Sequence, residues 1–208
     1  PWYMALRQTL PIYISIHVVF FIITCLSILF MVKDFTWQTQ PLHTLWQLWN
    51  RKDSGHYIWL ATHGYSDEWR TAFFPLYPLL IKFGTIFTHD AFIAALIISN
   101  FAGLLMLVTL YRIVEHDFSK EQAERTILYI SIFPTAFFFA AAYTESLFLF
   151  LIVLGFYHIQ RGHWWLAGLC GLLASLTRSA GVLLAIPFLY EYMQQRQFNI
   201  KAVRINLL

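Results

Sequence analysis

The sequence predicts an all-α, polytopic membrane protein: a bundle of transmembrane helices with one long loop after the first helix. Of the 208 residues, 59% are hydrophobic and only 12% are charged, whereas a soluble domain carries about 25% charged residues. The apolar residues form long runs that are separated by short polar turns. We therefore treat 1–208 as a single transmembrane domain. Because residue 1 is a proline and not an initiator Met, we expect a fragment or a processed form of a longer chain.

The two longest runs have the length of a membrane-spanning helix. Residues 12–32 and 91–111 are each 21 residues long and contain no Asp, Glu, Lys or Arg. At about 1.5 Å per residue each run covers about 31 Å, which is close to the ~30 Å hydrocarbon core of a bilayer. We place transmembrane segments at 12–32 and 91–113.

Four further apolar segments follow in the second half of the chain. The turns between them are too short for anything beyond hairpins, so neighbouring helices are expected to run antiparallel. The later segments are shorter than a full span, which tilting, polar helix ends or a re-entrant segment would explain. The expected segments are 126–143, 146–160, 163–177 and 180–193.

The distribution of Lys and Arg favours one orientation in the membrane. If the amino terminus is cytoplasmic, the cytoplasmic segments hold eight basic residues and the opposite side holds six. By the positive-inside rule, this orientation places the loop 34–90 and the turns 143–146 and 177–179 together on the extracytoplasmic face. The protein would lie in the plasma membrane of a prokaryote or in the endoplasmic reticulum of a eukaryote. A net charge of +3, scattered between helices, does not suggest a nucleic-acid partner.

The loop 34–90 carries the most informative motif. Asp53 stands where a helix could begin and Gly64 where it could end, as an N-cap and a C-terminal signal. On such a helix Asp53, His56 and Tyr57 share one face. Trp and Tyr are abundant nearby and favour the level of lipid headgroups, so we predict interfacial helices lying on the membrane surface. These aromatic residues could act as membrane anchors or as a platform for a sugar.

Functional and structural explanations remain open for each charged residue on this face. Asp53 could serve only as an N-cap, and His56 could be an interfacial side chain without chemistry. Glu145 and Arg178 fall in turns that are expected beside the same loop. Arg178 could merely extend towards the interface from a helix end, and Glu145 could only pair with it. Ionisable groups at membrane depth are costly, however, and therefore favour a functional hypothesis.

Several short motifs resemble a known family. The first loop contains Arg51-Lys52-Asp53-Ser54-Gly55-His56-Tyr57, then Gly64-Tyr65 and Phe73-Phe74-Pro75-Leu76-Tyr77-Pro78. Tyr143-Thr144-Glu145-Ser146 and Thr177-Arg178-Ser179 follow in the same order as in that family. Together they resemble the motifs of GPI mannosyltransferase 2 (PIG-V type) and its prokaryotic relatives. The sequence departs from the family pattern at Lys52, where a tryptophan is expected.

The resemblance implies a glycosyltransferase of the GT-C architecture that acts on the extracytoplasmic or luminal face. The donor would be a polyprenyl-phosphate sugar, typically mannose, and the acceptor a glycolipid, a glycan or a protein. By the same analogy Asp53 is the catalytic carboxylate, which takes the proton of the acceptor hydroxyl in an inverting transfer. Arg178 and His56 are candidates for binding the donor phosphate. Glu145, Tyr57 and Tyr143 are candidates for binding substrate. The apolar helices would hold the isoprenoid tail laterally, and membrane lipids are further expected partners.

The sequence argues against a metal or nucleotide site and leaves two alternative functions open. The sequence has no CxxC, HExxH or DxD motif and no Gly-rich nucleotide loop, so we expect neither a metal nor another cofactor. One alternative function is a transporter or lipid flippase, in which Glu145 and Arg178 line a substrate path. Another is a noncatalytic membrane assembly subunit, in which Asp53 only caps a helix.

Overall fold

The computed structural model describes residues 1–31, 49–50, 52–66 and 68–197. In these ranges the regular elements are helices and no strand is present. Together with the long apolar helices, this confirms the prediction of an all-α membrane protein. The first part of the expected loop, 34–48, and Arg51 of its motif lie outside the described residues, as do Lys201 and Arg204.

Among the described residues, two helices are long and apolar enough to cross a bilayer. They are α1 (Trp2–Met31) and α5 (Ala91–Asp117), with 30 and 27 residues. Both extend beyond the expected segments 12–32 and 91–113, α1 at its start and α5 at its end. At the start of α5, Ile93 N donates to Asp90 Oδ1 at 2.9 Å, so Asp90 caps this helix.

The segment expected as one helix at 126–143 is divided in the structure. Helix α6 (Lys120–Ile132) is followed by the short 3₁₀ helix η2 (Pro134–Ala136) and by α7 (Phe137–Ala140). Helix α8 (Glu145–Ile159) then leaves at a bend of 94°. The physical reason for the break is Pro134, because a proline cannot donate a helical hydrogen bond and restricts the residue before it to extended backbone.

The end of the described chain also departs from the expected helix at 180–193. Helix α9 (Trp164–Ser175) is followed by the 3₁₀ helix η3 (Ser179–Leu184), and only then by α10 (Ala185–Gln195). The chain turns back on itself so tightly that a Cβ atom on Gly181 would collide with backbone atoms of Ala174 and Ser175. This turn therefore requires glycine and leaves no room for a regular α-helical start.

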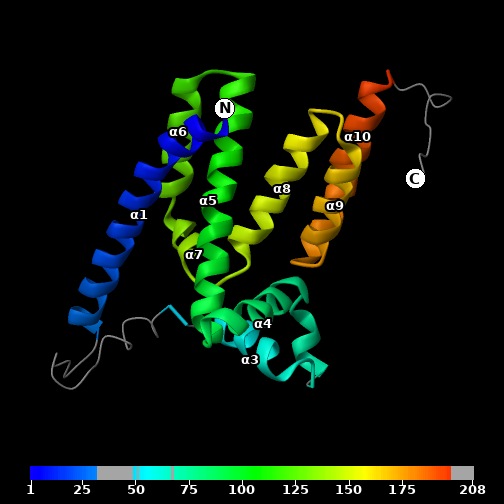
Figure 1. Cartoon of the computed structure of the whole chain (residues 1–208). Coiled ribbons are helices and arrows are strands. Elements are labelled where there is room, and N and C mark those ends of the chain that lie inside the picture. The colour runs from blue at the N-terminus through cyan, green and yellow to red at the C-terminus, as the bar shows by residue number, and fades with distance from the viewer. Residues whose placement is uncertain (32–48, 51, 67, 198–208) are drawn as a thin grey trace.

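Helix α5 lies at the centre of the bundle. It packs against α1, α4, α6 and α8, while α9 packs against α8. Figure 1 shows α3 (Asp53–His63) and α4 (Leu76–Thr88) across the lower end of the bundle, where α5 and α8 begin and α9 ends. A buried cluster that includes Tyr57, Tyr77 and Leu147 joins these loop helices to α5 and α8. This cluster fixes the position of the loop relative to the bundle.

Helix α3 begins and ends where the sequence suggested, but its first residue is not a cap. Gly64 is the C-cap, with φ of 76°, which suits glycine. The expectation that Asp53 is the N-cap was wrong, because Lys52 occupies the capping position with φ of 52° and its side chain makes no capping hydrogen bond. Asp53 is instead the first helical residue and is exposed. Its carboxylate stabilises the helix dipole without being used in a cap.

Candidate active site

An ion pair joins the two charged turns at the lower end of the bundle. Arg178 Nη1 donates to Glu145 Oε1 at 2.6 Å and to Thr144 Oγ1 at 3.3 Å. The side chains of Arg178 and Glu145 are 42% and 29% exposed, so a ligand can reach both. Among the described residues, both hydrogen bonds come from the same guanidinium nitrogen of Arg178, Nη1. The remaining guanidinium donors are suited to a phosphate group.

The backbone around Arg178 is tied to the loop helices. Arg178 has extended φ and ψ angles of −151° and 145°, and its N–H donates to Ala174 O at 3.0 Å. At the start of α4, Leu76 N donates to Leu176 O at 2.9 Å. This hydrogen bond brings together two motifs that lie far apart in the sequence, 73–78 and 177–179.

Helix α5 holds the bend that precedes Glu145. Ser99 Oγ donates to Tyr143 O at 2.8 Å. The buried Tyr77 hydroxyl lies 2.6 Å from Ser99 Oγ and also donates to Ala95 O at 3.1 Å. Asn100 Nδ2 donates to Ala140 O at 2.8 Å on the other side of the bend. These polar side chains of α5 and α4 therefore set where α8 begins.

Tyr57 lies among the charged groups of the site. Its side chain is 7% exposed, and this burial raises the pKa of its hydroxyl, which keeps the group protonated. A hydrogen bond to Thr144 and the positive charge of Arg178 act in the opposite direction, while Asp53 and Glu145 add to the increase. The buried hydroxyl of Tyr57 on α3 is therefore influenced both by the charge of Asp53 and by the charges of the ion pair.

Asp53 joins the same group of residues. It interacts electrostatically with the hydroxyls of Tyr57 and Tyr143, and Tyr143 interacts with Glu145 as well. Five of the six site residues chosen from the sequence are therefore linked by direct contact or by electrostatic influence. They are Asp53, Tyr57, Tyr143, Glu145 and Arg178.

His56 has a different environment from the one expected. Its ring lies 4.9 Å from the ring of Trp69, edge to face, and 5.1 Å from the ring of Phe73. Trp59 lies farther along α3, and the guanidinium of Arg70 lies over its ring, with Cζ 3.4 Å from the ring centre. The contacts that the structure gives for His56 are thus aromatic, and they place it in the packing between α3 and the 3₁₀ helix η1 (Glu68–Ala72).

Glu145 retains one acceptor for a ligand. Its Oε1 atom accepts from Arg178, but Oε2 is buried and has no hydrogen-bond partner among the described residues. A buried acceptor without a partner is uncommon in proteins. A hydroxyl group of a substrate could satisfy this oxygen.

Sequence reasoning missed the residues that position the site. Thr144 lay inside a recognised motif but was given no role, and Ser99 and Asn100 lay inside an apolar run. Adjacent polar side chains in such a run are costly unless they are paired, so Ser99 and Asn100 were a usable signal. The contact of Thr144 with Arg178 could not be inferred, since it depends on how the turn after α9 packs against the start of α8.

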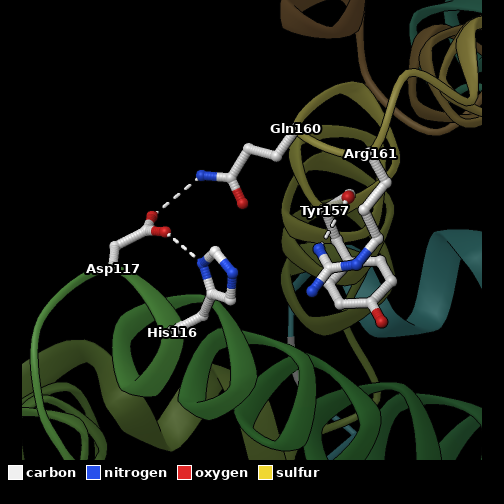
Figure 2. Close-up of polar contacts among 5 residues, drawn as sticks. All are labelled: His116, Asp117, Tyr157, Gln160 and Arg161. Atoms are coloured by element: carbon white, nitrogen blue, oxygen red, sulfur yellow. Dashed lines mark hydrogen bonds and ion pairs between the residues drawn. The ribbon is translucent and has the colours of Figure 1, made fainter.

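A second polar cluster lies at the opposite end of the bundle. Asp117 Oδ1 lies 2.8 Å from His116 Nδ1, and Asp117 Oδ2 accepts from Gln160 Nε2 at 2.9 Å. Figure 2 shows these contacts, with the guanidinium of Arg161 over the ring of Tyr157 at 3.5 Å. The cluster ties the end of α5 to the turn between α8 and α9, which is a structural role.

The site combines groups that suit transfer to a hydroxyl with loss of an anion. Asp53 is an exposed carboxylate that can accept a proton. Arg178 is a partly exposed cation that can stabilise a departing phosphate. Within the residues described by the structure, no group of three or more His, Cys, Asp or Glu side chains could hold a metal ion.

Comparison with known proteins identifies relatives over most of the chain. Residues 17–206 match the family described as Mannosyltransferase (PIG-V). The chain is 31% identical over 173 residues to GPI alpha-1,6-mannosyltransferase 2 of Cricetulus griseus, covering 76% of this chain and 34% of that protein. It is 35% identical over 143 residues to GPI mannosyltransferase 2 of Yarrowia lipolytica, covering 66% of this chain and 39% of that protein.

A human protein shows the same relationship. GPI alpha-1,6-mannosyltransferase 2 of Homo sapiens is 28% identical over 158 residues, covering 71% of this chain and 32% of that protein. The chain thus spans about a third of the length of the curated relatives it matches. No solved structure matches it significantly.

Proposed function

The chain belongs to the PIG-V mannosyltransferase family, and we propose that it transfers a hexose, mannose in the first instance, from a polyprenyl-phosphate donor to a glycolipid. The names of the relatives support mannose and a GPI-type glycolipid acceptor. One observation carries the choice of site: Tyr57 lies within electrostatic range of both Asp53 and Arg178. The groups needed at the two ends of a displacement reaction therefore both act on the same tyrosine, which supports placing them in one site.

Asp53 acts as the general base in this proposal. Its carboxylate takes the proton of an acceptor hydroxyl while the hydroxyl oxygen attacks the anomeric carbon of the donor. The bond between that carbon and the phosphate oxygen breaks, and the polyprenyl phosphate leaves with the electron pair. Attack opposite the leaving group inverts the anomeric configuration. Asp53 is exposed and is the first helical residue of α3, not its N-cap, so its carboxylate is available.

Arg178 stabilises the negative charge that develops on the departing phosphate. Its guanidinium is always charged and can donate two parallel hydrogen bonds to phosphate oxygens. Glu145 holds Nη1 at 2.6 Å and so directs the remaining donors. Glu145 Oε2 and the hydroxyl of Tyr143 are assigned to hydroxyl groups of the substrates. His56 supports the loop through its aromatic contacts with Trp69 and Phe73.

The active end is assigned to the extracytoplasmic or luminal face. Of the ten described Lys and Arg residues, six lie at the opposite end of the bundle, where α1 starts, α5 and α10 end, and α8 meets α9. Basic residues are retained on the cytoplasmic side, which supports this assignment. The six are Arg7, Arg112, Lys120, Arg125, Arg161 and Arg196.

Purified protein in lipid nanodiscs tests the proposal when it is given radiolabelled polyprenyl-phosphate mannose and a glycolipid acceptor. We expect label in the acceptor fraction, and release of an equal amount of polyprenyl phosphate. A lipid flippase in vesicles would move the labelled donor between leaflets without transfer, and an assembly subunit would do neither. Label that remains on the donor with every acceptor offered would contradict the proposal.

A further inference from the structure

A polar cluster lies where the two longest helices meet. His17 on α1 and Asn100 on α5 are joined by a hydrogen bond of 2.7 Å between His17 Nε2 and Asn100 Oδ1. The hydroxyl of Tyr13, one turn before His17, donates to the backbone oxygen of Asn100 at 2.9 Å. All three residues are partly buried within helices that are long and apolar enough to cross a bilayer. Polar groups at such a depth are costly, so this cluster calls for an explanation.

The hydrogen bonds determine how the amide of Asn100 is turned. Its Nδ2 group donates to Leu96 O and to Ala140 O, each at 2.8 Å. Carbonyl oxygens only accept hydrogen bonds, so the amide nitrogen faces these two atoms and the amide oxygen faces α1. The amide oxygen also only accepts, which makes Nε2 of His17 the donor. His17 therefore holds the amide in the orientation in which its nitrogen reaches Ala140.

Two neighbouring residues of α5 hold the bend before α8 at both of its ends. The carbonyl oxygen of Ala140, where α7 ends, accepts from Asn100 at 2.8 Å. The carbonyl oxygen of Tyr143 accepts from Ser99 Oγ, also at 2.8 Å. Ala140 is 0% exposed, so its carbonyl would lose the bond to Asn100 without solvent to replace it, which is costly. The bend would shift to regain a partner, and Glu145 at the start of α8 would move with it.

We propose that His17 is a positioning residue for the active site. By donating to Asn100, it keeps the amide turned towards the bend and so sets where Tyr143 and Glu145 lie. The inference rests on the proposed function, because Glu145 holds Arg178 at 2.6 Å and Arg178 binds the donor phosphate in that scheme. His17 lies on α1, which supplies none of the six site residues, and it acts on the site through Asn100.

Two substitutions separate the hydrogen bond of His17 from the space that its ring fills. His17→Phe keeps a ring beside Tyr13, whose ring centre lies 4.1 Å from that of His17, but removes the donor. His17→Gln supplies an amide N–H in place of Nε2. We expect His17→Phe to lower kcat for mannosyl transfer by about 10- to 100-fold with a smaller change in KM for the donor, and His17→Gln to stay within about threefold of the unaltered protein. A lower melting temperature with an unchanged kcat in His17→Phe would mean that His17 only packs, and would overturn the proposal.

Thr109 provides a matched control, because it is a buried polar residue of α5 whose hydrogen bond does not involve the bend. Its hydroxyl donates to Leu105 O of the same helix at 2.7 Å. Thr109→Val removes the hydroxyl and should leave kcat unchanged. A loss of kcat as large as that of His17→Phe would show that any polar contact within the bundle has this effect, and would overturn the assignment to His17.

A double-mutant cycle tests whether His17 acts through Asn100. Asn100→Ala removes the amide, so the addition of His17→Phe to this variant should lower kcat no further. Fully multiplicative effects on kcat would mean that the two residues act independently. That result would overturn the proposed connection between α1 and the bend.

A spectroscopic measurement tests the positioning without Asn100→Ala and without activity. 3-Fluorotyrosine is introduced only at position 143, where the ring lies 5.1 Å from the ring of Phe138 on α7. We expect the fluorine resonance to shift or broaden in His17→Phe and to stay unchanged in His17→Gln and Thr109→Val. An unchanged resonance in His17→Phe would refute the inference. A shifted resonance in a protein that transfers no mannose would support the positioning and reject the proposed function.

Discussion

Replacing Glu145 by Gln distinguishes a functional ion pair from a structural one. At 2.6 Å, two unit charges attract each other by about 1.6 kcal/mol in bulk water. Because Arg178 is 42% exposed, solvent screening and the ordering of both side chains reduce the net contribution to less than about 1 kcal/mol. Glutamine also keeps an oxygen that can accept from Nη1. We therefore expect Glu145→Gln to change the free energy of unfolding by less than about 1 kcal/mol.

The same substitution should have a large effect on transfer. Without the carboxylate, the guanidinium of Arg178 loses its strongest orienting contact, and a displacement of about 1 Å can cost about 100-fold in rate. We expect kcat/KM for mannosyl transfer to fall by about 10- to 100-fold. The assay measures transfer of radiolabelled mannose beside thermal unfolding in the same nanodiscs.

A matched ion pair provides the control for this experiment. Arg125 Nη2 and Glu121 Oε1 are also 2.6 Å apart, on α6, and their side chains are 63% and 73% exposed. Glu121→Gln should leave both transfer and stability nearly unchanged. If Glu145→Gln loses several kcal/mol of stability but keeps full activity, the pair is structural and the reasoning is refuted.

Two further substitutions test the packing that supports the site. Ser99→Ala leaves the buried Tyr77 hydroxyl and the Tyr143 carbonyl without this partner. We expect the free energy of unfolding to fall by about 1–3 kcal/mol. An unchanged denaturation midpoint would contradict the described bend. Gly181→Ala forces a Cβ against the backbone of Ala174 and should destabilise the protein by at least about 1–3 kcal/mol. In Gly168→Ala, by contrast, the added Cβ meets no atom within 4 Å, so this helical control should be neutral or stabilising by about 0.5–1 kcal/mol. Equal melting temperatures for the two alanine variants would show that the turn at Gly181 is not tight.

Much of the fold follows from composition and run length. The helices α1 and α5 are apparent in the sequence because lipid requires a long run of residues without charges. The break after Ile132 was missed, although Pro134 is visible in the sequence, because the apolar run continues through it. Hydropathy shows which residues avoid water, but it does not show where a helix breaks or bends. The 3₁₀ start of the last segment was missed for the same reason.

The site was partly predictable because short turns restrict where charged residues can lie. Glu145 and Arg178 were expected near the same loop, and the structure places them in contact at 2.6 Å. The N-cap role expected for Asp53 was wrong. Lys52 takes the capping position with a positive φ angle, and the sequence does not reveal that angle. The contacts of His56 depend on how α3 packs against the rest of the loop, and that of Thr144 on how the turn after α9 meets α8; both are properties of tertiary packing.

The most direct test of the proposed chemistry is a single-turnover assay of Asp53→Asn with labelled donor and acceptor. If Asp53 is the base, mannosyl transfer falls by at least about 100-fold while binding of the donor and thermal stability stay unchanged. Glu68→Gln, which alters an exposed carboxyl group in the same loop, should transfer mannose normally. Transfer by Asp53→Asn at the rate of the unaltered protein would contradict the assignment of this carboxylate and the mechanism built on it.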